Sequence, residues 1–134
     1  MGLIVDTGIF IRAERDGHRD PTALVPAGEE LGISIITLSE LLEGVHLANS
    51  PARAARRAEY IERLKKFMSI MSFDGQIVEV HAKLRATQRQ RGKMIGARDL
   101  IIAATAISMS WDVLTLNATE FRRVGRPRRA RAGL

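Results

Sequence analysis

The stretch RDLIIAATAI (residues 98–107) places a single acid, Asp99, at the start of an almost wholly apolar run. Residues 98–110 are apolar on nearly every side and rich in alanine, which predicts a helix that packs on several faces. We expect this helix to lie centrally, against a sheet. The carboxylate at its start is therefore predicted to occupy a fixed position beside that sheet.

Short apolar runs on both sides of this helix predict the strands of the sheet. They lie at residues 3–5, 33–36 and 113–116, with a further short strand expected near residues 70–73. Helical spacing is found in the segments 8–14, from 20 to 28 or 32, 37–47, from 51 to a break at 74–75, 77–92 and 117–123. Strands that alternate with helices favour parallel pairing, so the predicted class is α/β.

Length and composition fit one globular domain. The chain has 134 residues, 46% of them hydrophobic, and no cysteine, which excludes a disulfide framework and thiolate metal sites. The apolar runs are too short for a membrane span, and the N-terminus lacks the apolar core of a signal peptide. We predict a cytoplasmic protein that has one domain over residues 1–124, an arginine-rich tail over residues 125–134 and no association with membranes.

The chain is strongly basic, with a net charge of +6 and a sequence pI near 10.7. A basic tail can serve solubility alone, or it can bind a polyanion, of which nucleic acid is the most common. One Trp and one Tyr do not favour an aromatic platform for stacking bases. The candidate RNA-binding residues are Arg98, Arg122, Arg123 and Arg126.

Four acids follow or flank the predicted strands. Asp6 comes directly after the first strand, Glu40 lies one turn after the second, and Glu120 lies one turn after the last. Each acid, including Asp99, also has a purely structural interpretation as a helix cap. For Glu40 this is a capping box over residues 37–40, which form the pattern Thr-Leu-Ser-Glu.

The combination of the acids favours chemistry over capping. Ligands of parallel sheets gather at the carboxyl ends of the strands, so these acids are predicted to converge. Two carboxylates about 4 Å apart repel by roughly 4 kcal/mol at an effective dielectric near 20, so a cluster requires a cation or raised pKa values. Hard oxygen ligands without cysteine or paired histidines select Mg²⁺ or Mn²⁺. An acidic, metal-binding centre within a basic surface suits phosphodiester hydrolysis.

Other chemistries receive no support from the sequence. The three histidines, His18, His46 and His81, are isolated and have no partner at metal-ligand spacing. The chain also lacks the phosphate-binding pattern GxxxxGK[ST] and the dinucleotide-binding pattern GxGxxG. Nucleotide hydrolysis and dinucleotide binding are therefore not expected.

Four segments carry a resemblance to a known family. They read LIVDTGIF, ITLSELLEG, FDGQIVEVHAKLRATQRQRGKMIGARDLIIAATAI and VLTLNATEF, and together they extend from residue 3 to about residue 124. In this order and spacing the chain resembles the PIN-domain ribonucleases and, within them, the VapC toxins of bacterial toxin–antitoxin pairs. The resemblance implies a three-layer α/β/α fold around a central, mostly parallel sheet of four to five strands.

The resemblance also assigns roles to individual acids. Asp6, Glu40 and Asp99 match the three acids of the family's metal site, and Glu120 matches its less regular fourth acid. Glu43, one helical turn from Glu40, is an alternative contributor.

Two polar residues are implied to support these acids. Thr7 matches a small hydroxyl residue that holds a ligand or a water, and Asn117 is either a polar neighbour of the fourth acid or a helix cap. The chain departs from the family at residues 125–134, where arginine and small residues replace a regular strand pattern and leave a fifth strand open.

The implied activity is that of a Mg²⁺- or Mn²⁺-dependent endoribonuclease. It would cleave structured RNA, such as tRNA or rRNA, to inhibit translation, and leave a 3′-hydroxyl and a 5′-phosphate. The implied partners are a second copy of the chain and a small VapB-like antitoxin whose C-terminal segment often places an arginine among the acids. Two alternatives stay open: a PIN-like nuclease of RNA processing or decay, and a non-catalytic basic module that binds nucleic acid.

Overall fold

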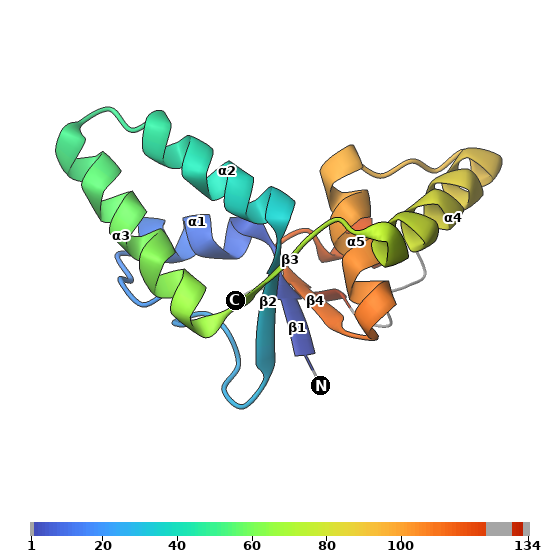
Figure 1. Cartoon of the computed structure of the whole chain (residues 1–134), viewed down its shortest axis with the longest axis horizontal. Coiled ribbons are helices and arrows are strands. Elements are labelled where there is room, and N and C mark those ends of the chain that lie inside the picture. Colours follow the sequence, from blue (N-terminus) through green and yellow to red (C-terminus); the bar gives the residue numbers. More distant parts are fainter. Residues whose placement is uncertain (1, 123–129, 133–134) are drawn as a thin grey trace.

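The computed structural model describes residues 2–122 and 130–132 (Figure 1). Its sheet has the strand order β3-β2-β1-β4-β5, and all four pairs of neighbouring strands are parallel. The strands are β1 (Gly2–Val5), β2 (Glu30–Ser34), β3 (Ser69–Met71), β4 (Asp112–Thr115) and β5 (Ala130–Ala132). The helices are α1 (Thr7–Arg15), α2 (Ile35–His46), α3 (Pro51–Phe67), α4 (Gly75–Arg91), α5 (Ala97–Met109) and α6 (Ala118–Arg122).

The helices cover both faces of the sheet, which confirms the predicted α/β/α layers (Figure 1). Successive residues of a strand point to opposite faces, so Leu3 and Val5 of β1 belong to one apolar cluster and Ile4 to another. The first cluster receives residues from α1, α2 and α3, and the second from α5 and α6. Because β1 and β4 are buried along their whole length, with helices on both faces of the sheet, their inner residues are apolar without alternation.

Side-chain caps place the ends of the long helices where the sequence predicts them. The Ser50 hydroxyl accepts a hydrogen bond from the Arg53 amide at 3.2 Å, and Pro51 occupies the first turn of α3. The Asp74 carboxylate accepts from the amides of the first turn of α4, and Gly92 ends that helix with φ of 67°.

The start of α2 differs from the prediction. Ile35 and Ile36, expected in the second strand, belong to the helix, because the Ser34 hydroxyl caps it by accepting from the Ile36 amide at 3.2 Å. The predicted capping box is therefore wrong: Thr37 is buried inside the first turn, and no partner for its hydroxyl is found among the described residues. Glu40 consequently lies in the second turn of α2, free of a capping role.

Two further expectations are corrected. The short helix expected from residue 20 is a turn, because Asp20 accepts hydrogen bonds from the Thr22 amide at 2.8 Å and hydroxyl at 2.7 Å and holds the chain in a local loop. Helix α3, expected to extend toward the break at residues 74–75, ends at Phe67, which is 58% exposed.

The segment expected as a tail contains the fifth strand. Residues 130–132 pair in parallel with β4, with Ala130 opposite Val113. The sheet thus reaches the upper end of the predicted four to five strands. Arg123 and Arg126 lie outside the described residues, and the domain boundary at residue 124 stays a prediction. Within the described part of the chain, no helix has the length and apolar character needed to cross a membrane.

The packing of α3 on the sheet can be tested with a matched pair of leucines. Leu64 is fully buried, whereas Leu47 is 72% exposed at the end of α2. We expect Leu64→Ala to lower the free energy of unfolding by about 2–5 kcal/mol, because it removes apolar contacts and leaves a cavity. Leu47→Ala should change it by no more than about 0.5 kcal/mol. Urea unfolding followed by circular dichroism measures both, and equal losses would contradict this packing.

Candidate active site

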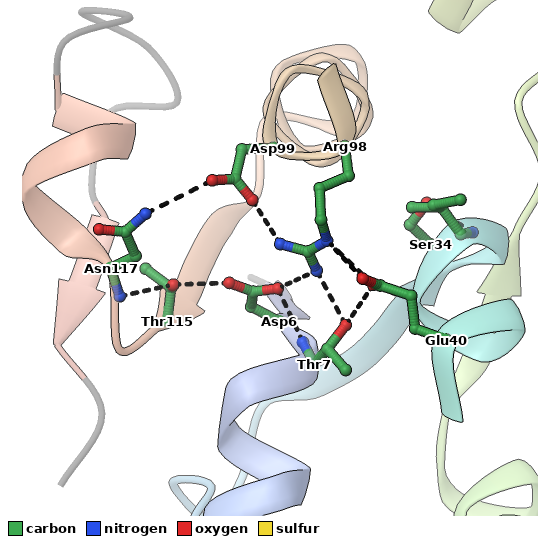
Figure 2. A network of polar contacts seen from close by, with 9 residues as sticks. Asp6, Thr7, Ser34, Glu40, Arg98, Asp99, Thr115 and Asn117 are labelled. Carbon is green, nitrogen blue, oxygen red and sulfur yellow. Dashed lines mark hydrogen bonds and ion pairs between the residues drawn. The ribbon is translucent and has the colours of Figure 1, made fainter. Parts of the chain in front are cut away.

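Three of the predicted acids lie together at the carboxyl edge of the sheet (Figure 2). Asp6 follows β1, Glu40 projects from α2, and Asp99 lies in the first turn of α5. The backbone of Asp6 continues the sheet, because its amide donates to the Leu114 carbonyl at 2.9 Å. These acids are remote in sequence and close in space, as predicted.

The acids meet around the guanidinium of Arg98. Its Nη2 lies 2.6 Å from Asp6 Oδ1, its Nη1 lies 2.5 Å from Asp99 Oδ1, and its Nε lies 2.8 Å from Glu40 Oε2. Each nitrogen of the guanidinium therefore pairs with a different carboxylate (Figure 2). Arg98, predicted as an RNA-binding residue, is engaged inside the site in this structure.

Two threonine hydroxyls fix the orientation of the acids. Thr7 Oγ1 donates to Glu40 Oε1 at 2.7 Å and accepts from Arg98 Nη2 at 2.8 Å. Thr115 Oγ1 donates to Asp6 Oδ2 at 2.8 Å and is completely buried. The Thr7 amide donates to Asp6 Oδ1 at 2.7 Å, so Asp6 caps α1 and belongs to the acid cluster at the same time.

Thr115 is a site residue that sequence reasoning missed. It is the last residue of β4, and the register pairs Leu114 with Val5, so the next residues of the two strands, Thr115 and Asp6, lie side by side. The only signal for Thr115 in the sequence was a hydroxyl residue at the end of a predicted strand. Recognising it required the pairing register, which the sequence does not specify.

The remaining predicted residues lie on the side of Asp99. Asn117 Nδ2 approaches Asp99 Oδ2 at 3.4 Å, and the Asn117 amide donates to Thr115 Oγ1 at 2.9 Å. Burial raises the pKa of Asp99; the Arg98 charge opposes this effect, and the charges of Asp6 and Glu120 add to it. Glu120 is therefore near enough for its charge to act on Asp99.

Arg98 remains charged in this environment. Burial alone would lower its pKa, but hydrogen bonds and charges from Asp6 and Glu40 outweigh burial and raise the pKa above its ordinary value. The guanidinium is thus a cation held by three carboxylates.

Two candidates lie outside this cluster. Glu43 is exposed on α2, and no hydrogen bond or ion pair of its side chain is found within the described residues. Arg122 is exposed at the end of α6.

The carboxylates of the cluster are chemically suited to a divalent ion. The chemistry fits, because carboxylate oxygens are the ligands that Mg²⁺ and Mn²⁺ prefer, and the acids already surround one cation. The distances between these carboxylates, however, suit the Arg98 guanidinium. Among residues 2–122 and 130–132, no three acidic or histidine side chains are arranged to hold a metal ion as they stand. The Arg98 guanidinium occupies the position between these carboxylates.

Comparison with known proteins agrees with the fold. The PIN domain family model matches residues 3–127. The chain is 36% identical over 124 residues to Ribonuclease VapC1 of Rickettsia felis, covering 92% of this chain and 91% of the relative. It is 34% identical to Ribonuclease VapC4 of Mycobacterium tuberculosis, covering 84% of this chain and 83% of the relative.

Solved structures give the same result. The crystal structure of FitAcB from Neisseria gonorrhoeae superposes with a TM-score of 0.82 at 26% identity, over 97% of this chain and 96% of that one. The structure of VapBC-1 from nontypeable Haemophilus influenzae superposes with a TM-score of 0.75 at 28% identity, over 93% of each chain. The chain belongs to the PIN-domain family and, within it, to the VapC ribonucleases.

Proposed function

We propose that the chain is the toxin of a toxin–antitoxin pair and hydrolyses phosphodiester bonds in structured RNA, tRNA or rRNA, with Mg²⁺ or Mn²⁺. One observation carries this proposal: Asp6, Glu40 and Asp99, brought from three separate elements, surround a single cation. A structural ion pair needs one acid, so three acids on one guanidinium are more than stability requires. The proposed place of action is the cytoplasm.

The acids would hold the ion, with Glu120 beside them. A bound Mg²⁺ or Mn²⁺ supplies an activated water and stabilises negative charge on a phosphoryl oxygen. The chain contributes orientation: Thr115 fixes Asp6 through Oδ2, and Thr7 fixes Glu40 through Oε1. The net charge of +6 attracts the RNA backbone to this acidic centre.

A surface groove supports an antitoxin partner. Structures similar to this chain include VapBC-5 of Mycobacterium tuberculosis, a member of the VapBC family of toxin–antitoxin systems, at a TM-score of 0.71 and 26% identity. Here a groove of about 190 Å³ between α1, α2 and α3 has a partly apolar lining and reaches Glu40. Its apolar residues are Phe10, Ile11, Leu41 and Ile61, and the charged Glu14 and Arg57 with Tyr60 line the rest. An apolar antitoxin segment in this groove would end beside the acid cluster.

The homodimer implied by the resemblance remains part of the proposal. Light scattering of the purified chain would measure its mass directly. The RNA-maturation alternative assigns the same chemistry to a chain without an antitoxin, so a neighbouring reading frame for a small binding partner separates the two.

Cleavage should depend on the acids and on the ion. We expect Asp6→Asn and Asp99→Asn each to lower the rate of cleavage of labelled RNA by about 100-fold or more, because each removes charge from the centre that stabilises the transition state. EDTA should abolish cleavage, and Mn²⁺ should restore it.

Glu43→Gln is the matched control, since it neutralises an exposed acid on the same helix as Glu40. It should leave the rate unchanged. Undiminished cleavage by Asp6→Asn, or in EDTA, would refute the metal-dependent mechanism, and RNA binding without cleavage by the unmodified chain would favour the non-catalytic module.

The groove can be tested separately. Ile11 on α1 and Val78 on α4 are similarly exposed, at 48% and 44%, but only Ile11 lines the groove. We expect Ile11→Asp to weaken binding of the proposed antitoxin by at least about tenfold, because a charge would be buried against an apolar segment. Val78→Asp should have no effect on the affinity measured by calorimetry. Equal effects of the two substitutions would place the antitoxin elsewhere.

A further inference from the structure

We propose that Arg98 is an internal counter-cation of the acid cluster: it holds Asp6, Glu40 and Asp99 together in the metal-free protein, and a divalent ion binds only by displacing it. This inference rests on the proposed function, since it concerns the same acids and the same ion. It adds that a side chain of the protein itself, Arg98, competes with the divalent ion for the acid cluster.

The contacts of the guanidinium make the two occupants mutually exclusive. Its nitrogens take Asp6 Oδ1, Asp99 Oδ1 and both oxygens of Glu40, at distances from 2.5 to 3.0 Å. The other oxygens of Asp6 and Asp99 accept from Thr115 Oγ1 and Asn117 Nδ2 instead, so the oxygens on the guanidinium are the ones left for an ion. A guanidinium and a metal ion therefore cannot use them at the same time.

The cluster needs a cation in either state. Asp6 and Asp99 are buried, and their charges act on each other, which is one reason why the pKa of Asp99 is raised. Removing Arg98 leaves these carboxylates to repel one another without compensation. Arg98 supplies one positive charge, whereas Mg²⁺ or Mn²⁺ supplies two, so an ion at sufficient concentration can replace it.

The position of Arg98 makes it exchangeable. Its side chain is 33% exposed, so it can leave the acids without unfolding of the core. It lies in the first turn of α5, where the positive end of the helix dipole disfavours a cation. The N-cap residue, Gly96, provides no side-chain acceptor there. The side chain is thus held mainly by the acids themselves and by the Thr7 hydroxyl.

The first experiment measures Mn²⁺ binding, using electron paramagnetic resonance of free Mn²⁺ in the absence of RNA. We expect Arg98→Met to bind Mn²⁺ at least tenfold more tightly than the unmodified chain, because the ion no longer competes with the guanidinium. Arg57→Met is the matched control: Arg57 is a partly exposed arginine that pairs with Glu14 at 3.1 Å and with the Gly44 carbonyl at 2.7 Å, away from the acids. It should leave the affinity unchanged.

Thermal unfolding of the same proteins provides a second readout. In EDTA, Arg98→Met should melt at a lower temperature than the unmodified chain, and Mn²⁺ should raise its melting temperature more than that of the unmodified chain. If Arg98→Met does not fold in EDTA, Arg98→Lys serves instead, because an ammonium keeps the charge but does not match three carboxylates at once. It should show an intermediate gain in Mn²⁺ affinity.

Displacement itself is observable by nuclear magnetic resonance of arginine Nε–H groups. Mg²⁺ should shift the Arg98 signal from a hydrogen-bonded to a solvent-exposed state, while the Arg57 signal stays constant. A merely structural Arg98 would keep its signal when Mg²⁺ binds.

The outcomes separate the inference from the proposed function. Equal Mn²⁺ affinities for Arg98→Met and the unmodified chain, or an unchanged Arg98 signal on binding, would overturn the internal counter-cation and leave the metal site standing. Absence of Mn²⁺ binding by every one of these proteins would overturn the metal site, and the inference with it. Tighter binding by Arg98→Met and release of the Arg98 signal would support both.

Discussion

The convergence of three carboxylates on one cation is the interaction on which the rest of the site depends. Asp6, Glu40 and Asp99 come from the end of β1, from α2 and from the start of α5, and the Arg98 guanidinium contacts each of them. Buried like charges repel, so this arrangement is stable only with a positive charge at its centre. Arg98 of α5 therefore reaches across to Glu40 of α2 (Figure 2).

The parallel sheet places these acids at one edge. All described strands run in the same direction, so their carboxyl ends meet at that edge, and buried apolar residues fix the register of β1 against β4. The register in turn places the buried Thr115 hydroxyl on Asp6. Core packing and site geometry are thus two consequences of the same strand pairing, and the helices on both faces exclude water from Asp6 and Asp99.

Much of this could be predicted from the sequence, because apolar runs, caps and the order of the acids are local signals. Ser50-Pro51, Asp74 and Gly92 mark helix ends whatever the tertiary contacts. The start of α2 could not be predicted, because Ile35 and Ile36 are β-branched and Thr37 with Glu40 imitates a capping box, whereas Ser34 is the actual cap. The contacts of Arg98 with three acids could not be predicted either, because they depend on where α2 and α5 lie relative to β1.

The most direct measurement is anomalous X-ray diffraction from crystals of the protein equilibrated with Mn²⁺. We expect one strong anomalous peak within ligand distance of the carboxylates of Asp6 and Asp99, with the Arg98 side chain turned away from them. A structure in which Mn²⁺ is absent from these acids, or binds elsewhere while the Arg98 guanidinium keeps its three carboxylate contacts, would contradict a metal-dependent active site at this edge of the sheet.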